Sequence, residues 1–528
     1  MQKDKSINEF RFGEEEMTIG RALNLAQGLE KGILTTEVRS RVQKSRDVVE
    51  QIVHKKKIVY GINTGFGPLC TTLIGEEDTK KLQYNLLMSH SVGVGNLIDK
   101  GIAKLMMILK VHALCKGYSG IAVETVERII WHIENEVIPC VPEQGSVGAS
   151  GDLAPLSHLF LPLIGMGKVW FHNEIKSMSE VLELLGMQPV DLGPKEGLAL
   201  INGTQFMSAH AIILLEKFQN CLDHADIIAA IDHEAMMGSV KCFDEELHSL
   251  RPYSGSVYVA KRMRALLHHS QIVTSHKNCH RVQDPYSLRC IPQVHGASRN
   301  AWLHLKETML IEINSVTDNP IIFSEDNTIS GGHFHGQPIA MPIDYAGLAA
   351  AELGNIADRR VYLSMMESVP GLPKLLMSRT GLNSGFMILQ YSTAALVSEN
   401  KTQCFPASAD SIPTSLGQED HVSMGSIGVR KSLRIVENLE KILAIEMFTA
   451  AQGFDFRRPL KSGILIEEAH KLIREQISFA DTDRIFSDDI EKAIDLIRSK
   501  NIISQLNHVA KNHHIDFKNE EHELFGIY

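Results

Sequence analysis

Four long stretches of this chain carry apolar residues around most of the helical circumference, and helices of that kind must be buried on several sides. They run approximately over residues 197–237, 297–316, 339–365 and 427–451 of the 528. Few strand-like segments separate them. The sequence therefore predicts a mainly α fold built on a long central helical bundle.

The residues before the long helices show a different, mixed pattern. Helical spacing recurs up to about residue 53 and over 104–138, whereas 165–176 has the alternation and central turn of a β-hairpin. We therefore expect two domains. The first, 1–205, combines short helices with minor strands, and the second, 206–528, holds the long helices.

Charge and hydropathy exclude several classes of function. The chain has 53 Lys and Arg against 63 Asp and Glu, a net charge of −10, with no long basic run, so binding to nucleic acid or to an anionic membrane is not expected. Its first residues lack the pattern of a signal peptide, and no apolar run is long enough to span a membrane. These features predict a cytoplasmic globular protein whose partner is a small molecule.

The cysteines also predict a cytoplasmic protein. The eight cysteines are scattered without a Cys-x-x-Cys pair, which favours free thiols in a reducing compartment over a disulfide framework. Only the segment from His276 to His280, which includes Cys279, has a spacing that resembles a metal site. Because no second cluster completes it, we interpret it as an ordinary loop and expect no bound metal.

The most unusual short motif is Gly148-Ala149-Ser150-Gly151-Asp152, in which small residues let the backbone bend sharply. Such a turn can react with itself. If the nitrogen of Gly151 attacked the carbonyl carbon of Ala149, loss of water would close a five-membered imidazolone ring. Loss of the Ser150 hydroxyl as a second water would leave an exocyclic methylidene, a strong electrophile that no ordinary side chain supplies.

The residues of this motif alone also allow three other interpretations. It could be a flexible loop, an anion-binding turn ahead of a helix, or a degenerate form of the serine-hydrolase turn Gly-x-Ser-x-Gly. The last is disfavoured because Asp152 stands where that turn requires glycine. The other motifs of the chain are needed to decide.

Polar residues elsewhere gather in loops and at the ends of helices. A glycine-rich loop follows Tyr60, and His90 ends a helical run. The second half of the chain carries three further polar segments, QDPYSLRC at 283–290, SGGHFHGQ at 330–337 and GQEDHVSM at 417–424. As exceptions in an otherwise buried bundle, they are candidates for a functional site.

These motifs, in this order, resemble those of the aromatic amino acid ammonia-lyases. The similarity extends from about residue 58 to 451 and includes the blocks YGINTGFG, LLMSHSVGVG, GSVGASGDLAPLSH, GLALINGTQ, QDPYSLRC, SVTDNP, SGGHFHGQP and GQEDHVSMG. The resemblance implies that Ala149, Ser150 and Gly151 mature autocatalytically into a 4-methylidene-imidazol-5-one (MIO) group, with no external cofactor. It also implies a homotetramer whose core is the long-helix domain and whose active sites combine loops from three subunits.

The same resemblance assigns roles to individual residues. Tyr60 matches the base that removes the β-proton of the substrate, and Arg289 matches the guanidinium that holds its carboxylate through two parallel hydrogen bonds. Further matching positions are Tyr286, a catalytic residue, Gln283 and Asn202, which contact the carboxylate or the prosthetic group, and Phe334, an apolar wall. Without the resemblance, the sequence would predict that Tyr60 is a packed aromatic residue and that Arg289 forms an ion pair at the end of a helix. Asp152 is either a proton shuttle or anchor for cyclisation, or the N-cap of the next helix.

Substrate preference depends on two positions. A buried imidazole needs polar partners, which a phenyl ring would leave unsatisfied, and His90 and Glu419 can provide them. Similar phenylalanine and tyrosine lyases tend to carry glutamine in place of Glu419. Tyrosine-specific relatives can also have a histidine in the Ser89-His90 pair, so Glu419 is the residue that favours histidine as the substrate.

The chain also departs from residues that are common in the family. The departures are Ile291, His295, His333, Gly336 and Gln337. We expect them near the substrate ring and the subunit contacts, where they would affect kinetic preference. No proposed catalytic position is lost.

The expected activity is the elimination of ammonia from L-histidine to give trans-urocanate, the first step of histidine degradation. One alternative is a tyrosine or phenylalanine ammonia-lyase, or a related aminomutase that returns the amine to the β-carbon. Another is a non-catalytic helical scaffold whose turn never matures.

Overall fold

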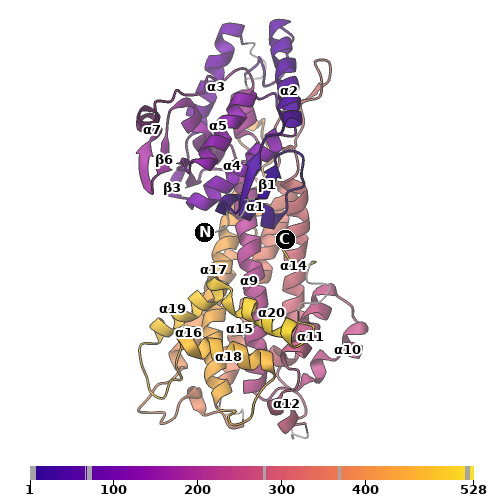
Figure 1. Cartoon of the computed structure of the whole chain (residues 1–528), viewed down its shortest axis with the longest axis vertical. Coiled ribbons are helices and arrows are strands. Elements are labelled where there is room, and N and C mark those ends of the chain that lie inside the picture. The colour runs from indigo at the N-terminus through magenta and orange to yellow at the C-terminus, as the bar shows by residue number, and fades with distance from the viewer. Residues whose placement is uncertain are drawn as a thin grey trace, which may run out of the picture.

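The computed structural model of the chain describes residues 8–65, 67, 74–277, 281–366, 370–517 and 524–527. Figure 1 shows an elongated molecule in which a group of short elements lies on one end of a long helical bundle. Strands form only small two- and three-stranded sheets within the described residues. The mainly α fold predicted from the sequence is confirmed.

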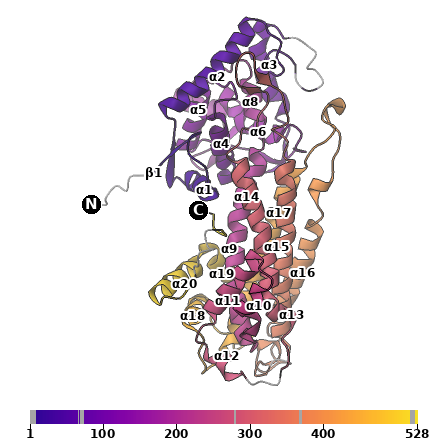
Figure 2. The same ribbon diagram turned by 90° about the vertical axis from the view of Figure 1, so that its right-hand side faces the viewer.

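The long apolar stretches all form helices that run side by side (Figure 2). The bundle consists of α9 (Gln205–Ala235), α14 (Ile291–Glu312), α15 (Gln337–Ser364), α16 (Met387–Gln403) and α17 (Gly425–Asp455). Helices α15 and α17 pack along their lengths, and α9 packs against both. Because these helices bury residues on most sides, their interior holds the largest part of the hydrophobic core.

Shorter helices surround the far half of the bundle. They are α10 (Glu245–Ser249), α11 (Ser254–Leu266), α12 (Gln271–Ser275), α13 (Tyr286–Arg289), α18 (Ile464–Gln476), α19 (Phe486–Ser499) and α20 (Asn501–Asn512). Helix α11 approaches α14 closely. A Cβ on Gly255 would lie 2.1 Å from the carbonyl oxygen of Gly296, so this crossing requires glycine.

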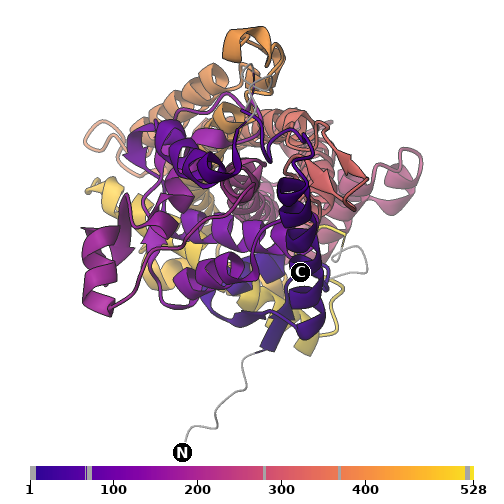
Figure 3. The same cartoon turned by 90° about the horizontal axis from the view of Figure 1, so that it is seen from above.

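The N-terminal part covers one end of the bundle, as Figure 3 shows from above. Its helices are α1 (Ile19–Gln27), α2 (Thr36–His54), α3 (Glu76–His90), α4 (Lys100–Leu114), α5 (Val123–Glu134), α6 (Leu153–Phe160), α7 (Met178–Leu185) and α8 (Glu196–Ile201). The helical pattern over 104–138 is divided into α4 and α5 because Gly117 and Gly120 lie between them with φ of 80° and 67°.

The strands are short and pair locally. They are β1 (Asn8–Arg11), β2 (Glu30–Ile33), β3 (Val94–Leu97), β4 (Ile138–Pro139), β5 (Pro142–Gln144), β6 (Lys168–Phe171), β7 (Glu174–Ser177), β8 (Ile321–Ile322) and β9 (Thr328–Ile329). Strands β1 and β2 form a parallel pair, with Asn8 opposite Glu30. The hairpin predicted over 165–176 is confirmed as β6–β7, with His172 and Asn173 at its tip at φ of 49° and 63°.

The two parts of the chain meet where α9 begins at Gln205, close to the expected domain boundary. Helices α4 and α6 pack on α9, and the carbonyl of Ile527 accepts a hydrogen bond of 2.8 Å from the backbone N–H of Gly20. The division into domains 1–205 and 206–528 stays a prediction. Within the described ranges, no helix is long and apolar enough to cross a membrane.

Candidate active site

The backbone bends sharply at the Ala-Ser-Gly turn. Gly148, Ser150 and Gly151 all have positive φ, of 78°, 52° and 80°. A Cβ on Gly148 would lie 2.2 Å from Oγ of Ser423, and one on Gly151 would lie 2.2 Å from the carbonyl oxygen of Gly203. Both glycines are therefore required by conformation and by space, and Ser150 is held in the left-handed region.

Neighbouring segments hold this turn on several sides. The carbonyl oxygen of Gly203 accepts a hydrogen bond of 2.7 Å from the backbone N–H of Asp152. The side-chain amide of Asn202 donates to the carbonyl oxygen of Ser150 over 2.8 Å. The Ser150 hydroxyl donates to Oε1 of Glu419 over 2.7 Å. Ser150 is thus linked both to the N-terminal part and to the loop before α17.

Asp152 does not cap the helix that follows it. The residue stands at the N-cap position of α6, but its Oδ2 accepts from the backbone N–H of Met207, in the first turn of α9, over 3.0 Å. The interpretation of its side chain as the cap of the next helix is wrong. Burial raises the pKa of Asp152 to about 7.

Lys110 is a residue of this site that the sequence reasoning missed. It is buried on α4, and its Nζ donates to the carbonyl oxygen of Asn202 over 2.7 Å. Burial lowers its pKa to about 7. The available signal was a single lysine inside the apolar run LMMILKVHAL, because a charged group in such a run requires a specific partner.

A cavity of about 830 Å³ lies against the turn. The predicted site residues that line it are Tyr60, His90, Ser150, Asn202, Phe334 and Glu419. Apolar side chains of Leu82, Leu86, Leu153, Leu198 and Ile201 complete one wall. A cavity with a few convergent polar groups on an apolar lining is suited to a small organic ligand.

Tyr60 faces the cavity from the loop after α2. Its hydroxyl oxygen accepts a hydrogen bond of 3.3 Å from the backbone N–H of Gly67. A donor at this position stabilises a phenolate relative to the neutral phenol. Residues 66 and 68–73 of the same loop lie outside the described residues.

His90 and Glu419 lie on the same cavity. Nδ1 of His90 contacts the hydroxyl of Ser89 at 3.0 Å, and burial lowers the pKa of His90 although the charge of Glu419 opposes this. Oε2 of Glu419 accepts from the hydroxyls of Thr414, over 3.1 Å, and Ser415, over 2.8 Å. Together with Ser150, these hydroxyls fix the orientation of the carboxylate.

Asn319 and Gln418 also line the cavity, although no role was predicted for either. Oδ1 of Asn319 accepts from the backbone N–H of Gly331 over 2.7 Å, and its amide donates to the hydroxyl of Ser330 over 3.0 Å. Asn319 therefore holds the loop that leads to Phe334. The block SVTDNP was recognised in the sequence. Because it is separate from the segment 330–337, the contact of Asn319 with Ser330 and Gly331 was not predicted.

Three predicted residues do not reach the cavity of this chain. Gln283, Tyr286 and Arg289 lie in or beside α13, which is at the opposite end of the bundle from α6 and α8 (Figure 2). Tyr286 is 71% exposed, and the guanidinium of Arg289 lies 4.6 Å from the centre of its ring. Arg289 makes no ion pair with any described residue, so the helix-end ion pair is not observed.

The departures from family residues are divided between the two ends of the bundle. His333, Gly336 and Gln337 flank Phe334, and the amide of Gln337 donates to the carbonyl oxygen of Ser408 over 3.3 Å. Ile291 and His295 are instead fully buried at the start of α14 and do not line the cavity. These two residues are therefore away from the cavity of this chain, and their expected place near the substrate ring and the subunit contacts stays a prediction.

In the segment interpreted as an ordinary loop, each ring nitrogen of His276 lies within hydrogen-bonding distance of a backbone carbonyl oxygen. The distances are 2.7 Å to Ile272 and 3.0 Å to Gly238. Cys279 and His280 lie outside the described residues. No group of three or more His, Cys, Asp or Glu suited to a metal ion is found in the ranges that the structure covers.

Residues 17–475 match the model of a family described as aromatic amino acid lyase. The chain belongs to this family. The lyase is 45% identical over 475 residues to a histidine ammonia-lyase of Natranaerobius thermophilus, an alignment that covers 90% of this chain and 94% of the relative.

Two solved structures of the family superimpose on the lyase with a TM-score of 0.89. A histidine ammonia-lyase from Trypanosoma cruzi is 38% identical, with 98% of this chain and 97% of that chain covered. A tyrosine aminomutase from Streptomyces globisporus is 33% identical, with 95% and 98% covered. These identities establish the family fold, and the choice between substrates depends on the residues of the cavity.

Proposed function

We propose that this lyase eliminates ammonia from L-histidine and releases trans-urocanate, the first step of histidine degradation. The observation that carries the proposal is the hydrogen bond of 2.7 Å between the Ser150 hydroxyl and Oε1 of Glu419. It sets a carboxylate, the partner that an imidazole N–H requires, directly beside the reactive turn. The similarity to relatives named histidine ammonia-lyase supports the same substrate.

The residues of the turn fit an MIO group. The positive φ of Ser150 and Gly151 supplies the bend that ring closure needs, and the amide of Asn202 already donates to the oxygen that becomes the ring carbonyl. When formed, the group supplies an electrophilic carbon that takes up the substrate amine and makes it a better leaving group. Asn202 draws electron density toward the carbonyl oxygen, which favours that uptake.

The other cavity residues bind the substrate and move its proton. Tyr60 removes the β-proton, with the N–H of Gly67 stabilising its phenolate form. The imidazole of the substrate donates to Glu419 and contacts His90, while Phe334 and the leucine wall exclude water. A phenyl ring in the same position would leave the Glu419 carboxylate without that donor, and this difference sets the preference for histidine.

The carboxylate of the substrate is held by residues from other subunits. Arg289, Tyr286 and Gln283 lie too far along the bundle to serve the cavity of their own chain. We therefore propose a homotetramer in which the α13 segment of a neighbouring chain reaches the cavity, so that active sites are shared between subunits. A monomer with full activity in sedimentation and activity measurements would contradict this arrangement.

The test is an assay of the purified protein with L-histidine, L-tyrosine and L-phenylalanine, together with its intact mass. We expect urocanate from histidine alone and a mass lower than that of the sequence by two water molecules. A product from tyrosine but not histidine would overturn the substrate assignment. An unmodified mass in protein without activity would instead support the scaffold alternative.

A further inference from the structure

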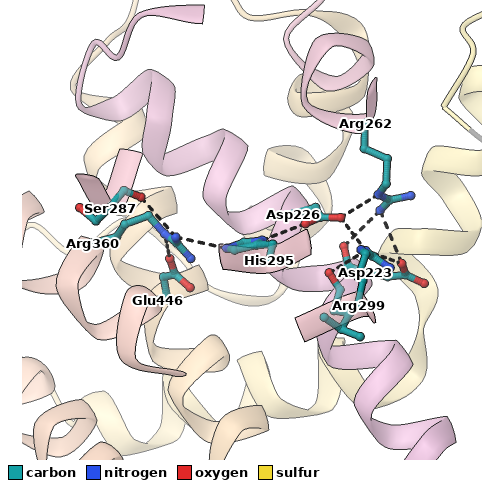
Figure 4. A network of polar contacts seen from close by, with 9 residues as sticks. Asp223, Asp226, Arg262, Ser287, His295, Arg299, Arg360 and Glu446 are labelled. Atoms are coloured by element: carbon teal, nitrogen blue, oxygen red, sulfur yellow. Dashed lines mark hydrogen bonds and ion pairs between the residues drawn. The ribbon is translucent and has the colours of Figure 1, made fainter. Parts of the chain in front are cut away.

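A relay of buried polar side chains, none of which lines the cavity, connects helices of the bundle (Figure 4). Oδ1 of Asp226, on α9, lies 2.9 Å from Nδ1 of His295, on α14. Nε2 of His295 lies 3.3 Å from Nη1 of Arg360, on α15. All three side chains are fully buried, so their protonation and orientation depend on one another.

The charges around Asp226 determine the direction of each hydrogen bond. Burial by itself raises the pKa of Asp226, but the charges of Arg299 and Arg262 and the bond from His295 outweigh it and hold that pKa well below its usual range. Asp226 is therefore an acceptor, and Nδ1 of His295 donates to it. Since a guanidinium only donates, Nε2 of His295 accepts from Arg360. The imidazole is neutral, in agreement with the lowering of its pKa by burial.

Arg360 carries the relay to α13. Its Nε is ion-paired with Glu446, and its Nη1 donates over 3.4 Å to the carbonyl oxygen of Ser287. Burial and the neighbouring Glu446 charge raise the pKa of Asp232, and the charge of Arg360 opposes this rise. The relay thus ends on the backbone between Tyr286 and Arg289.

The α13 segment needs such support because four residues cannot form a stable helix alone. Its other anchor is Asp284, which accepts from the backbone N–H of Ser239 over 2.6 Å and pairs with Arg281 at 3.0 Å. Between the two anchors, Tyr286 projects outward with the Arg289 guanidinium stacked on its ring.

We propose that the Asp226–His295–Arg360 relay is a positioning device for the residues that bind the substrate carboxylate. The relay fixes the Ser287 carbonyl and, through the α13 backbone, the direction in which Arg289 presents its two parallel donors. Bidentate recognition tolerates little misorientation, so loss of the relay weakens carboxylate binding without altering the imidazole site. The inference depends on the proposed role of Arg289, and it gives His295, a departure from the family's common residues, a function.

Equilibrium binding to the full chain carrying Ser150→Ala tests the relay without the chemical step. Calorimetry measures Kd for L-histidine and for histamine, which has the same imidazole and amine but no carboxylate. With Arg360→Lys we expect Kd for L-histidine to rise roughly tenfold to a hundredfold, while Kd for histamine stays unchanged. His295→Met should act in the same direction, and His295→Gln less, because an amide can both donate and accept.

Arg299→Lys is the matched control. Arg299 is as deeply buried as Arg360 and also belongs to the Asp226 network, but it has no contact with α13 among the described residues. Its substitution should lower the melting temperature and leave the ratio of the two Kd values unchanged. If Arg360→Lys does not fold, the variants His295→Met and His295→Gln test the proposal through the same ratio of Kd for L-histidine to Kd for histamine.

The variant Arg289→Met distinguishes the relay proposal from the proposed role of Arg289 in binding the substrate carboxylate. In one outcome, Arg289→Met abolishes the preference for L-histidine over histamine, while Arg360→Lys and His295→Met either weaken the binding of both ligands equally or leave both unchanged. The relay proposal is then overturned, and the role of Arg289 stands. If Arg289→Met leaves the ratio unchanged, the proposed role of Arg289 is wrong, and the relay proposal that depends on it is overturned as well.

Discussion

Two buried clusters of charged side chains in this lyase behave in opposite ways. Beside the Ala-Ser-Gly turn, burial moves Lys110 and Asp152 toward their neutral forms, with both pKa values at about 7. In the bundle core, burial is outweighed by ion pairs that hold Asp226 and Arg299 in their charged forms.

The difference comes from direct pairing. Asp226 contacts two guanidinium groups and an imidazole, whereas Lys110 and Asp152 bond chiefly to backbone groups. A backbone partner compensates desolvation less than an opposite charge does. The cluster at the turn is therefore able to exchange protons near neutral pH, and the core network is a fixed support.

The largest expected effect comes from Ser150→Ala, which removes the hydroxyl that the proposed MIO group requires and leaves the core network intact. We expect activity to fall by at least about a thousandfold, because the electrophile cannot form. The melting temperature should change little. Intact mass checks the cause, since loss of the Ser150 hydroxyl as water becomes impossible. A variant that keeps near-normal activity would contradict the role of the turn.

Asp226→Asn should have the largest effect on stability. It leaves Arg262 and Arg299 buried with Asp223 as their remaining carboxylate partner, and breaking a buried pair of this kind costs about 3–5 kcal/mol. Denaturant unfolding of both proteins measures this difference. Because the folded pKa of Asp226 lies below its unfolded value, its stabilisation is present above about pH 4 and is lost as the pH falls further. The difference between the two proteins should therefore narrow in acid.

Asp152→Asn should show the opposite dependence on pH. The folded pKa of Asp152 is raised to about 7, so its favourable contribution is complete below the unfolded value near 4 and is lost as the pH rises through about 7. The variant keeps the acceptor for Met207 but does not ionise. Across that range the wild type should lose up to about 4 kcal/mol relative to the variant, measured by unfolding at several pH values. A constant difference would show that Asp152 does not titrate there.

Glu419→Gln should produce the smallest of these effects, and one confined to the cavity. An amide cannot replace the charged acceptor for the substrate imidazole, so kcat/KM for histidine should fall by about tenfold to a hundredfold. Stability should stay within experimental error of the wild type. Steady-state kinetics with histidine and tyrosine provide the measurement, and an unchanged ratio between the substrates would remove the argument for histidine.

Much of the cavity was predictable because its residues occur in recognisable blocks. Tyr60, His90, Asn202, Phe334 and Glu419 were all identified, and the structure brings them together around Ser150. Lys110 was missed because its partner, Asn202, is distant in sequence, and Asn319 because its contacts join two separate blocks. For Asp152 the sequence left two roles open, a shuttle or anchor for cyclisation and the cap of the next helix, because a local capping rule cannot detect an acceptor needed by α9.

By itself the sequence determined the long buried helices and the bend at the turn, since helical periodicity and glycine placement are local properties of the chain. The cavity residues were indicated by the resemblance of its motifs to those of a known family. Only the tertiary structure decided which groups meet. It separated α13 from the cavity along the bundle and set His295 between Asp226 and Arg360, and it decided which buried groups keep their charge. The physical reason is that these outcomes depend on distances between helices, which no pattern within one helix specifies.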